Sequence, residues 1–257
     1  MKRAIFICML VVALMGSAFT AKAQYYQVNE SEDVQLHTGF QVSDRINDRW
    51  GLNWGEEFYF GNNISQFQKL YSRLMVHYYL LPNLTLSPMV MHIVDRVNDK
   101  HTMIYDMNVI YTHRIDRLAL TLRGGTRLQD VVYPEVTNMG VVKVNPEFML
   151  RGHIGASYRL LEGLEPFANI ETFLILNPAT DEILDPTIYT VGHYLPRVRS
   201  NVGVKYHFDS HHSLSLYWRY DYTQSKYLSY EIADAPFGII TNRNTNNFVG
   251  LFYDFKF

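Results

Sequence analysis

One pair of side chains in this sequence has the spacing of a hydrolytic site. His211 precedes Ser213 by two residues, so an imidazole could deprotonate a hydroxyl if a third group oriented the ring. Asp209 is the only acid close by in the sequence, and all three residues lie in the short polar segment FDSHHS. We therefore interpret them as polar residues of a tight turn, with lipid hydrolysis as the alternative.

Other residue types that can carry chemistry are present in weaker patterns. Asp209, His211 and His212 imitate a metal-binding cluster, but adjacent histidines project differently and no further ligand is nearby. Glu57 and Glu171 could form an acid/base pair, although neutralising nearby arginines is the simpler role. Four methionines could bind a soft metal or simply fill apolar surfaces: Met89, Met91, Met103 and Met107. No phosphate-binding glycine loop or dinucleotide fingerprint is present. We expect no catalytic residue, cofactor or metal.

The first residues have the pattern of a secretory signal peptide. Lys2 and Arg3 precede an apolar run over residues 4–19, and Ala-Lys-Ala at 21–23 supplies a cleavage signature. The domains are therefore expected to be a cleaved signal peptide, 1–23, and a mature chain, 24–257. The single cysteine, Cys8, lies in the segment that would be removed, so the mature chain would carry no thiol.

The composition limits the class of protein. The chain has 257 residues, 47% of them hydrophobic and 14% aromatic, yet its mean hydropathy is only −0.12. No run of 18 or more apolar residues follows the N-terminal segment, so no membrane-spanning helix is expected. The net charge of −2 does not suggest a nucleic-acid partner.

Period-two alternation predicts strands through most of the mature chain. Eleven candidates of roughly 9 to 14 residues are visible, which is the length that crosses a bilayer at a tilt. The connections between them alternate in length. LPN, RIDR and LEG are short, whereas QDVVYPEVTNMGVVKVN and NPATDEILDPTIYTVGHYLP are long. This asymmetry is typical of outer-membrane β-barrels, with short turns on one side of the membrane and long loops on the other.

Charged residues recur on the face of each strand opposite the apolar one. Such charges would be costly against lipid, but they can line the lumen of a closed barrel. The lumen-lining candidates are Glu57, Lys69, Arg73, His77, Asp106, Arg123, Arg127, Arg151, His153, Arg159, Glu171, Arg197, Arg199, Lys205, Arg219 and Asp221. Basic residues outnumber acidic ones in this set, which predicts a modest preference for anions.

The chain ends on an unusually regular apolar strand, FVGLFYDFKF. One face carries Val249, Leu251, Tyr253, Phe255 and the terminal Phe257. We interpret these residues as the signal read by a bacterial barrel-assembly machinery. Because bacterial single-chain barrels have even strand counts, we expect a twelfth, short strand at 24–29 that turns at 29–33. A ten-stranded barrel is the alternative.

Several segments together resemble an uncharacterised family of outer-membrane barrels of Gram-negative bacteria, a domain of unknown function that is found in Bacteroidetes among others. They are RWGLNWGEEFYF, LALTLRGGTRLQD, EPFANIETFLILN and RVRSNVGVKYHFDSHHSLSLYWRYDY, in this order. The resemblance implies a transmembrane, antiparallel, up-and-down β-barrel in the outer membrane. It implies no activity and no functional residues.

Three functions are compatible with such a barrel, since the fold does not determine function. The first is a narrow, porin-like channel or transport-related barrel for small polar or anionic solutes. The second is a structural or surface-interaction barrel with a closed lumen. The third is a lipid or lipopolysaccharide hydrolase, but Leu214 and Ser215 stand where such barrels carry Asn and Gly. The expected partners are outer-membrane lipid, lipopolysaccharide, periplasmic chaperones and the assembly machinery.

Overall fold

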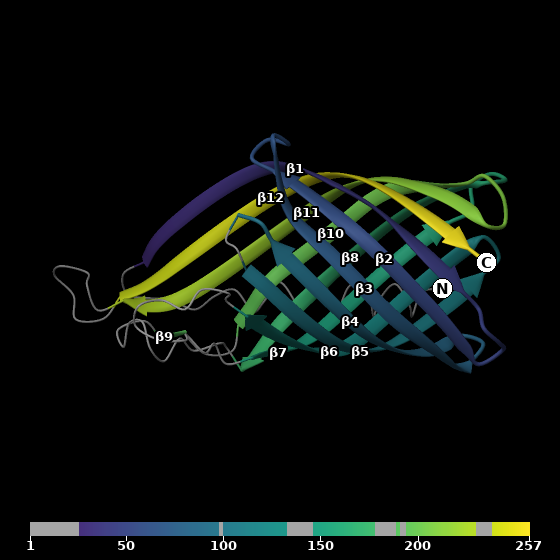
Figure 1. Ribbon diagram of the computed structural model, residues 1–257, viewed down its shortest axis with the longest axis horizontal. Coiled ribbons are helices and arrows are strands. Elements are labelled where there is room, and N and C mark those ends of the chain that lie inside the picture. Colours follow the sequence, from purple (N-terminus) through teal and green to yellow (C-terminus); the bar gives the residue numbers. More distant parts are fainter. Residues whose placement is uncertain (1–25, 98–99, 133–145, 178–188, 191–193, 230–237) are drawn as a thin grey trace, which may run out of the picture.

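The computed structural model describes residues 26–97, 100–132, 146–177, 189–190, 194–229 and 238–257. The expected signal peptide, 1–23, lies outside them. All regular elements of the described chain are strands of one sheet (Figure 1). They are β1 (Tyr26–Asp44), β2 (Trp50–Gly61), β3 (Gln66–Leu81), β4 (Leu84–Asp95), β5 (Lys100–Ile115), β6 (Leu118–Val132), β7 (Glu147–Tyr158), β8 (Leu164–Asn177), β9 (Tyr189–Thr190), β10 (Tyr194–His207), β11 (His212–Ser229) and β12 (Gly238–Lys256).

The sheet closes on itself to form a barrel whose strands run obliquely to its long axis (Figure 1). Neighbouring strands pair antiparallel from β1 to β8, then β8 with β10, β10 with β11 and β11 with β12. The two-residue β9 pairs only with the end of β11. The other eleven strands of the sheet make up the closed ring of the described chain. Closure leaves no open edge around the ring.

The first and last strands close the ring in parallel. Their pairing runs continuously from Tyr26 opposite Ile239 to Ser43 opposite Lys256. An odd number of antiparallel strands makes this necessary, because the first and the eleventh strand then point the same way. The expectation of twelve strands, or of ten, is therefore wrong for the described chain.

The error lies at the N-terminal end of the barrel. We expected a separate strand at 24–29 and a turn at 29–33, but residues 26–44 form the single strand β1. Pairing with β12 continues through these polar residues, so the backbone groups that face β12 have partners without a turn. β1, β11 and β12 are the longest strands and project beyond the others at one end of the barrel (Figure 1).

The alternation of side chains separates two surfaces. On β2 the even-numbered residues point outward, and Trp50 and Trp54 are 44% and 43% exposed. The odd-numbered residues of the same strand, among them Glu57 and Tyr59, are buried inside the ring. The other strands repeat this pattern, so the outer surface is largely apolar and the inner surface is largely polar. Among the described residues, no helix has the length and apolar character to cross a membrane.

Short turns connect the strands at the end of the barrel where β12 finishes. β3 passes to β4 through residues 82–83, and β5 passes to β6 through Asp116 and Arg117. Asp116 adopts a φ of 53°, in the left-handed region that aspartate tolerates in turns. The long connections that the sequence predicts over 129–145 and 177–196 lie largely outside the described residues.

Candidate lumenal site

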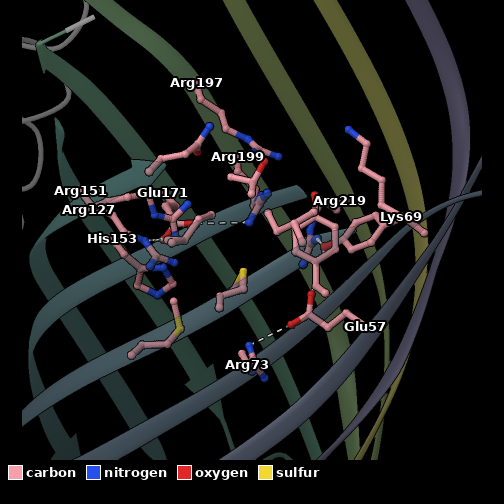
Figure 2. A pocket seen from close by; sticks show the side chains of 18 of the residues that line it. Glu57, Lys69, Arg73, Arg127, Arg151, His153, Glu171, Arg197, Arg199 and Arg219 are labelled. Carbon is pink, nitrogen blue, oxygen red and sulfur yellow. Dashed lines mark hydrogen bonds and ion pairs between the residues drawn. The ribbon is translucent and has the colours of Figure 1, made fainter. Parts of the chain in front are cut away.

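Inside the ring, side chains from nine strands surround a cavity of about 380 Å³. Figure 2 shows the charged groups that converge on it. The cavity is lined by eight cationic side chains, Lys69, Arg73, Arg123, Arg127, Arg151, Arg197, Arg199 and Arg219, and by three carboxylates, Glu57, Asp95 and Glu171. Positive charge therefore dominates the lining.

One group of arginines is organised around Glu171 on β8. Arg151 Nε lies 2.5 Å from Oε1 of Glu171, and Arg123 donates to the same oxygen. Arg199 approaches the second oxygen, Oε2, at 3.5 Å. Arg151 also reaches Asp106 Oδ2 at 2.5 Å. These strands are neighbours around the ring, so their registers bring the charged groups to the same height.

An aromatic ring contacts Arg151 and two neighbouring arginines, Arg127 and Arg197. Phe173 on β8 is 2% exposed and is packed with Met149 and Ile175. The guanidinium carbons of Arg127, Arg151 and Arg197 lie 5.1, 5.5 and 5.8 Å from the centre of its ring. Cation–π contacts of this kind orient guanidinium groups without neutralising them. Phe173 therefore helps to hold these arginines in place beside the carboxylates with which they pair.

A second polar group lies across the cavity, around Glu57 on β2. Its carboxylate pairs with Arg73 Nη1 at 2.9 Å and with His37 Nε2 at 3.0 Å. The other ring nitrogen of His37 is hydrogen-bonded to the Tyr217 hydroxyl. This chain of groups links β1, β2, β3 and β11 across the closure of the barrel.

Arg219 joins this second group through neutral partners. Its Nε donates to Asn201 Oδ1 at 2.7 Å, and its Nη1 donates to the Tyr59 hydroxyl at 3.1 Å. A longer contact of 3.4 Å connects Nη2 to the Tyr217 hydroxyl. Within the described part of the chain, no carboxylate lies within ion-pair distance of this guanidinium. Arg219 therefore brings to the cavity a positive charge that has no direct carboxylate partner among the described residues.

Part of the cavity wall is apolar. Met89, Met91 and Ile104 form a buried cluster on the inner faces of β4 and β5, with Tyr71, Met75 and Ile93 packed against it. These six residues line the same cavity as the arginines. The four methionines considered above thus divide between two surfaces. Met89 and Met91 point inward, whereas Met107 is 47% exposed on the outside, and Met103 shares its outward face.

The structure places most of the predicted lumenal residues inside the ring. Those at the cavity are Glu57, Lys69, Arg73, Arg123, Arg127, Arg151, His153, Glu171, Arg197, Arg199 and Arg219. Asp106 and Asp221 are buried behind them as partners of Arg127 and Arg197. His77 is hydrogen-bonded to the buried Ser87 at 2.8 Å, and Lys205 pairs with Asp254.

Arg159 is the exception among these candidates. We expected it in the lumen, but β7 ends at Tyr158 and the Arg159 side chain is exposed in the turn. Its backbone N–H donates to the carbonyl of Arg117 in the adjacent turn, at 2.9 Å. The alternation that would turn this side chain inward stops where the strand stops.

The residues of the site that were not predicted include Asp95 and three inner-face residues around Glu57. His37, Tyr59 and Tyr217 lie on the inner faces of β1, β2 and β11 and connect Glu57 to Arg219. Their odd positions in strands whose even positions are apolar would have identified them. Tyr59 and Tyr217 carry no charge and so fell outside a prediction based on charged groups, and His37 lies on β1, where no lumenal residue was predicted.

The His211–Ser213 pair is divided between two environments. His211 is exposed in the turn before β11, whereas Ser213 is buried and its hydroxyl lies 3.4 Å from Asp254 Oδ2. Asp209 accepts the backbone N–H groups of His211 and His212, both at 2.7 Å. These two hydrogen bonds hold the pKa of the Asp209 carboxyl below its usual range. Asp209 therefore shapes the turn instead of orienting an imidazole.

No metal-binding group of three or more His, Cys, Asp or Glu residues occurs in the part of the chain that the structure describes. Glu57 and Glu171 each pair with arginine and do not contact one another. The site is thus a cationic cavity with a partly apolar wall.

Comparison with known proteins places the chain in a family. No curated protein is significantly similar in sequence. Among solved structures, one described as the NanC porin in a rhombohedral crystal form aligns with 13% identity and a TM-score of 0.45. The alignment covers 74% of this chain and 87% of that one. Residues 34–228 match the family described as "Protein of unknown function (DUF2490)". Since this match spans most of the barrel, the chain belongs to the DUF2490 family.

Proposed function

We propose that this chain is an outer-membrane β-barrel, exported by the signal peptide expected at 1–23, whose lumen is a narrow path for small anionic solutes. The closed ring supports insertion into a bilayer, because strands paired on both sides around the ring leave no open edge there. The apolar outer surface supports it as well, since exposed apolar surface on this scale marks contact with lipid or protein. Outer-membrane lipid and lipopolysaccharide are then its surroundings.

The lining of the cavity carries the proposal of anion preference. Eight cations face three carboxylates there, and rings of Arg and Lys favour anions because permeating ions exchange hydration for the local field. Eleven strands enclose a smaller space than the 16 to 18 strands of general porins. We therefore expect small conductance with a modest preference for anions.

Single-channel recording in planar bilayers tests this function. Under a potassium chloride gradient, the reversal potential should show chloride preference in the wild-type barrel. Arg219→Gln should reduce this preference, because it removes a lumenal charge that forms no direct ion pair with a described carboxylate. Arg117→Gln, which changes an exposed turn residue, is the matched control and should leave the reversal potential unchanged. Cation selectivity in the wild type would overturn the proposal.

A closed structural barrel is the second candidate, and one observation favours it. Arg151 bridges Asp106 and Glu171, and Arg199 bridges Glu171 and Asp221. Such a bridged network can fill a lumen with fixed side chains. A folded, heat-modifiable barrel that never opens a conducting path in the bilayer would identify this alternative.

A further inference from the structure

The inner wall of the barrel carries two buried apolar clusters. Met149, Phe173 and Ile175 lie on β7 and β8 and do not line the cavity, whereas Met89, Met91 and Ile104 lie on β4 and β5 and do line it. Met89 is 4% exposed and Ile104 is 2% exposed. These apolar side chains would not help a small hydrated ion to pass, because they cannot replace the water molecules that coordinate it.

The arginines lie on the other strands around the same cavity. Arg123, Arg151, Arg199 and Arg219 come from β6, β7, β10 and β11, and they line the cavity together with the apolar cluster. Met89 and Met91 line the same cavity as Arg73 and the arginine group around Glu171. A single molecule in this cavity would therefore meet an aliphatic surface and guanidinium groups at once.

From this arrangement we infer that the cavity binds an amphipathic organic anion, whose carboxylate, sulfonate or phosphate group meets the arginines and whose apolar body packs on Met89, Met91 and Ile104. Methionine suits such a surface because its flexible, polarisable side chain adapts to irregular apolar shapes. The volume of about 380 Å³ lies near the lower end of the range for small-molecule sites, roughly 300 to 1,000 Å³.

Arg219 is the strongest candidate to hold the anionic group. Its guanidinium is fixed by Asn201 and Tyr59, so it is already oriented before a ligand arrives. Its ring contacts with Tyr217 and Phe248, at 5.3 and 5.8 Å, restrict it further. Preorganisation of this kind lowers the entropic cost of binding.

The inference rests on the proposed function, because a ligand reaches the cavity only through an accessible lumen. Binding should be measured by calorimetry on the full barrel in lipid nanodiscs, with empty nanodiscs as the blank. The probes are 4-phenylbutyrate, butyrate, the neutral 4-phenylbutanamide and inorganic phosphate. We expect 4-phenylbutyrate to bind at least tenfold more tightly than each of the other three.

Two variants separate the apolar from the ionic contribution. Met89→Gln with Met91→Gln should weaken 4-phenylbutyrate binding about tenfold and leave butyrate binding unchanged, whereas Met89→Leu with Met91→Leu should retain wild-type binding. Arg219→Gln should weaken both carboxylates. Heat-modifiable migration verifies that each barrel is folded.

The outcomes distinguish this inference from the proposed function. If wild-type barrel binds 4-phenylbutyrate no better than butyrate while its channel remains anion-selective, the inference is wrong and the proposed function stands. If the neutral amide binds as tightly as the anion, the arginines have no part and the inference also fails. Absence of both binding and conductance overturns the two together.

Discussion

Asp106 and Arg127 stand directly opposite one another on β5 and β6 and form a two-point ion pair. Arg127 Nε contacts Oδ1 and Arg127 Nη2 contacts Oδ2, both at 2.8 Å. Oδ2 also accepts from Arg151 on β7. Asp106 is 4% exposed, so two guanidinium groups depend on one carboxylate that water scarcely reaches.

Replacing Asp106 by Asn should destabilise the barrel substantially. The change removes the carboxylate that pairs with Arg127 and one of the two carboxylates that Arg151 bridges. Breaking a buried ion pair typically costs about 3 to 5 kcal/mol. Urea unfolding of the barrel in lipid vesicles measures the difference. Asp116→Asn, in an exposed turn with positive φ, is the control and should change the free energy of unfolding by less than about 0.5 kcal/mol. If Asp106→Asn lowered the free energy of unfolding no more than Asp116→Asn does, the Asp106–Arg127 ion pair would make no contribution to stability.

Gly250 on β12 leaves room for the ring of Tyr217, the residue that His37 contacts. A Cβ atom at Gly250 would lie 2.1 Å from Tyr217 Cζ, so Gly250→Ala must displace the ring. Overpacking of this kind costs about 1 to 3 kcal/mol. Gly124→Ala is a matched control, since its Cβ would meet no atom within 4 Å. Chemical unfolding should show a lower free energy of unfolding for Gly250→Ala than for Gly124→Ala. If Gly250→Ala were as stable as the wild type, the packing of the Tyr217 ring against Gly250 would be contradicted.

The turn before β11 should open in acid. The pKa of Asp209 is lowered in the folded chain, with the His211 backbone hydrogen bond as the first cause. A depressed pKa means that the stabilising contact is fully present above the unfolded value, about 3.9, and is lost as the pH falls through the lower folded value. The amide chemical shifts of His211 and His212, followed by NMR, should change over that window. In Asp209→Asn the amide shifts of His211 and His212 should not change over this pH window. If they changed as in the wild type, the Asp209 carboxyl would not be the group that titrates.

The terminal aromatic should matter for assembly more than for stability. The Phe257 side chain is 74% exposed and packs only against Phe255 at a ring distance of 4.7 Å among the described contacts. Its backbone N–H bonds to Ser43 whatever the side chain is. We expect Phe257→Ser to lower the amount of folded barrel in cells several-fold while refolding normally in detergent. Assembly at wild-type levels in cells would show that Phe257 is no part of a recognition signal.

The sequence by itself determined which side chains face inward. Trp54 and Glu57 occupy positions of opposite parity on one strand, and a strand turns positions of opposite parity to opposite faces. The same rule placed Arg73, Arg151 and Arg219 inside without any knowledge of their partners. It failed at Arg159, because parity holds only while the strand continues and the end of β7 depends on the turn that follows.

Only the tertiary structure decided the closure and the grouping of charges. Parallel pairing of β1 with β12 makes an odd ring possible, and it depends on strands that are more than 200 residues apart in the chain. The meeting of Arg123, Arg151 and Arg199 at Glu171 likewise depends on the registers of β6, β7, β8 and β10. Register sets the height of each side chain along the barrel, and alternation within one strand contains no information about that height.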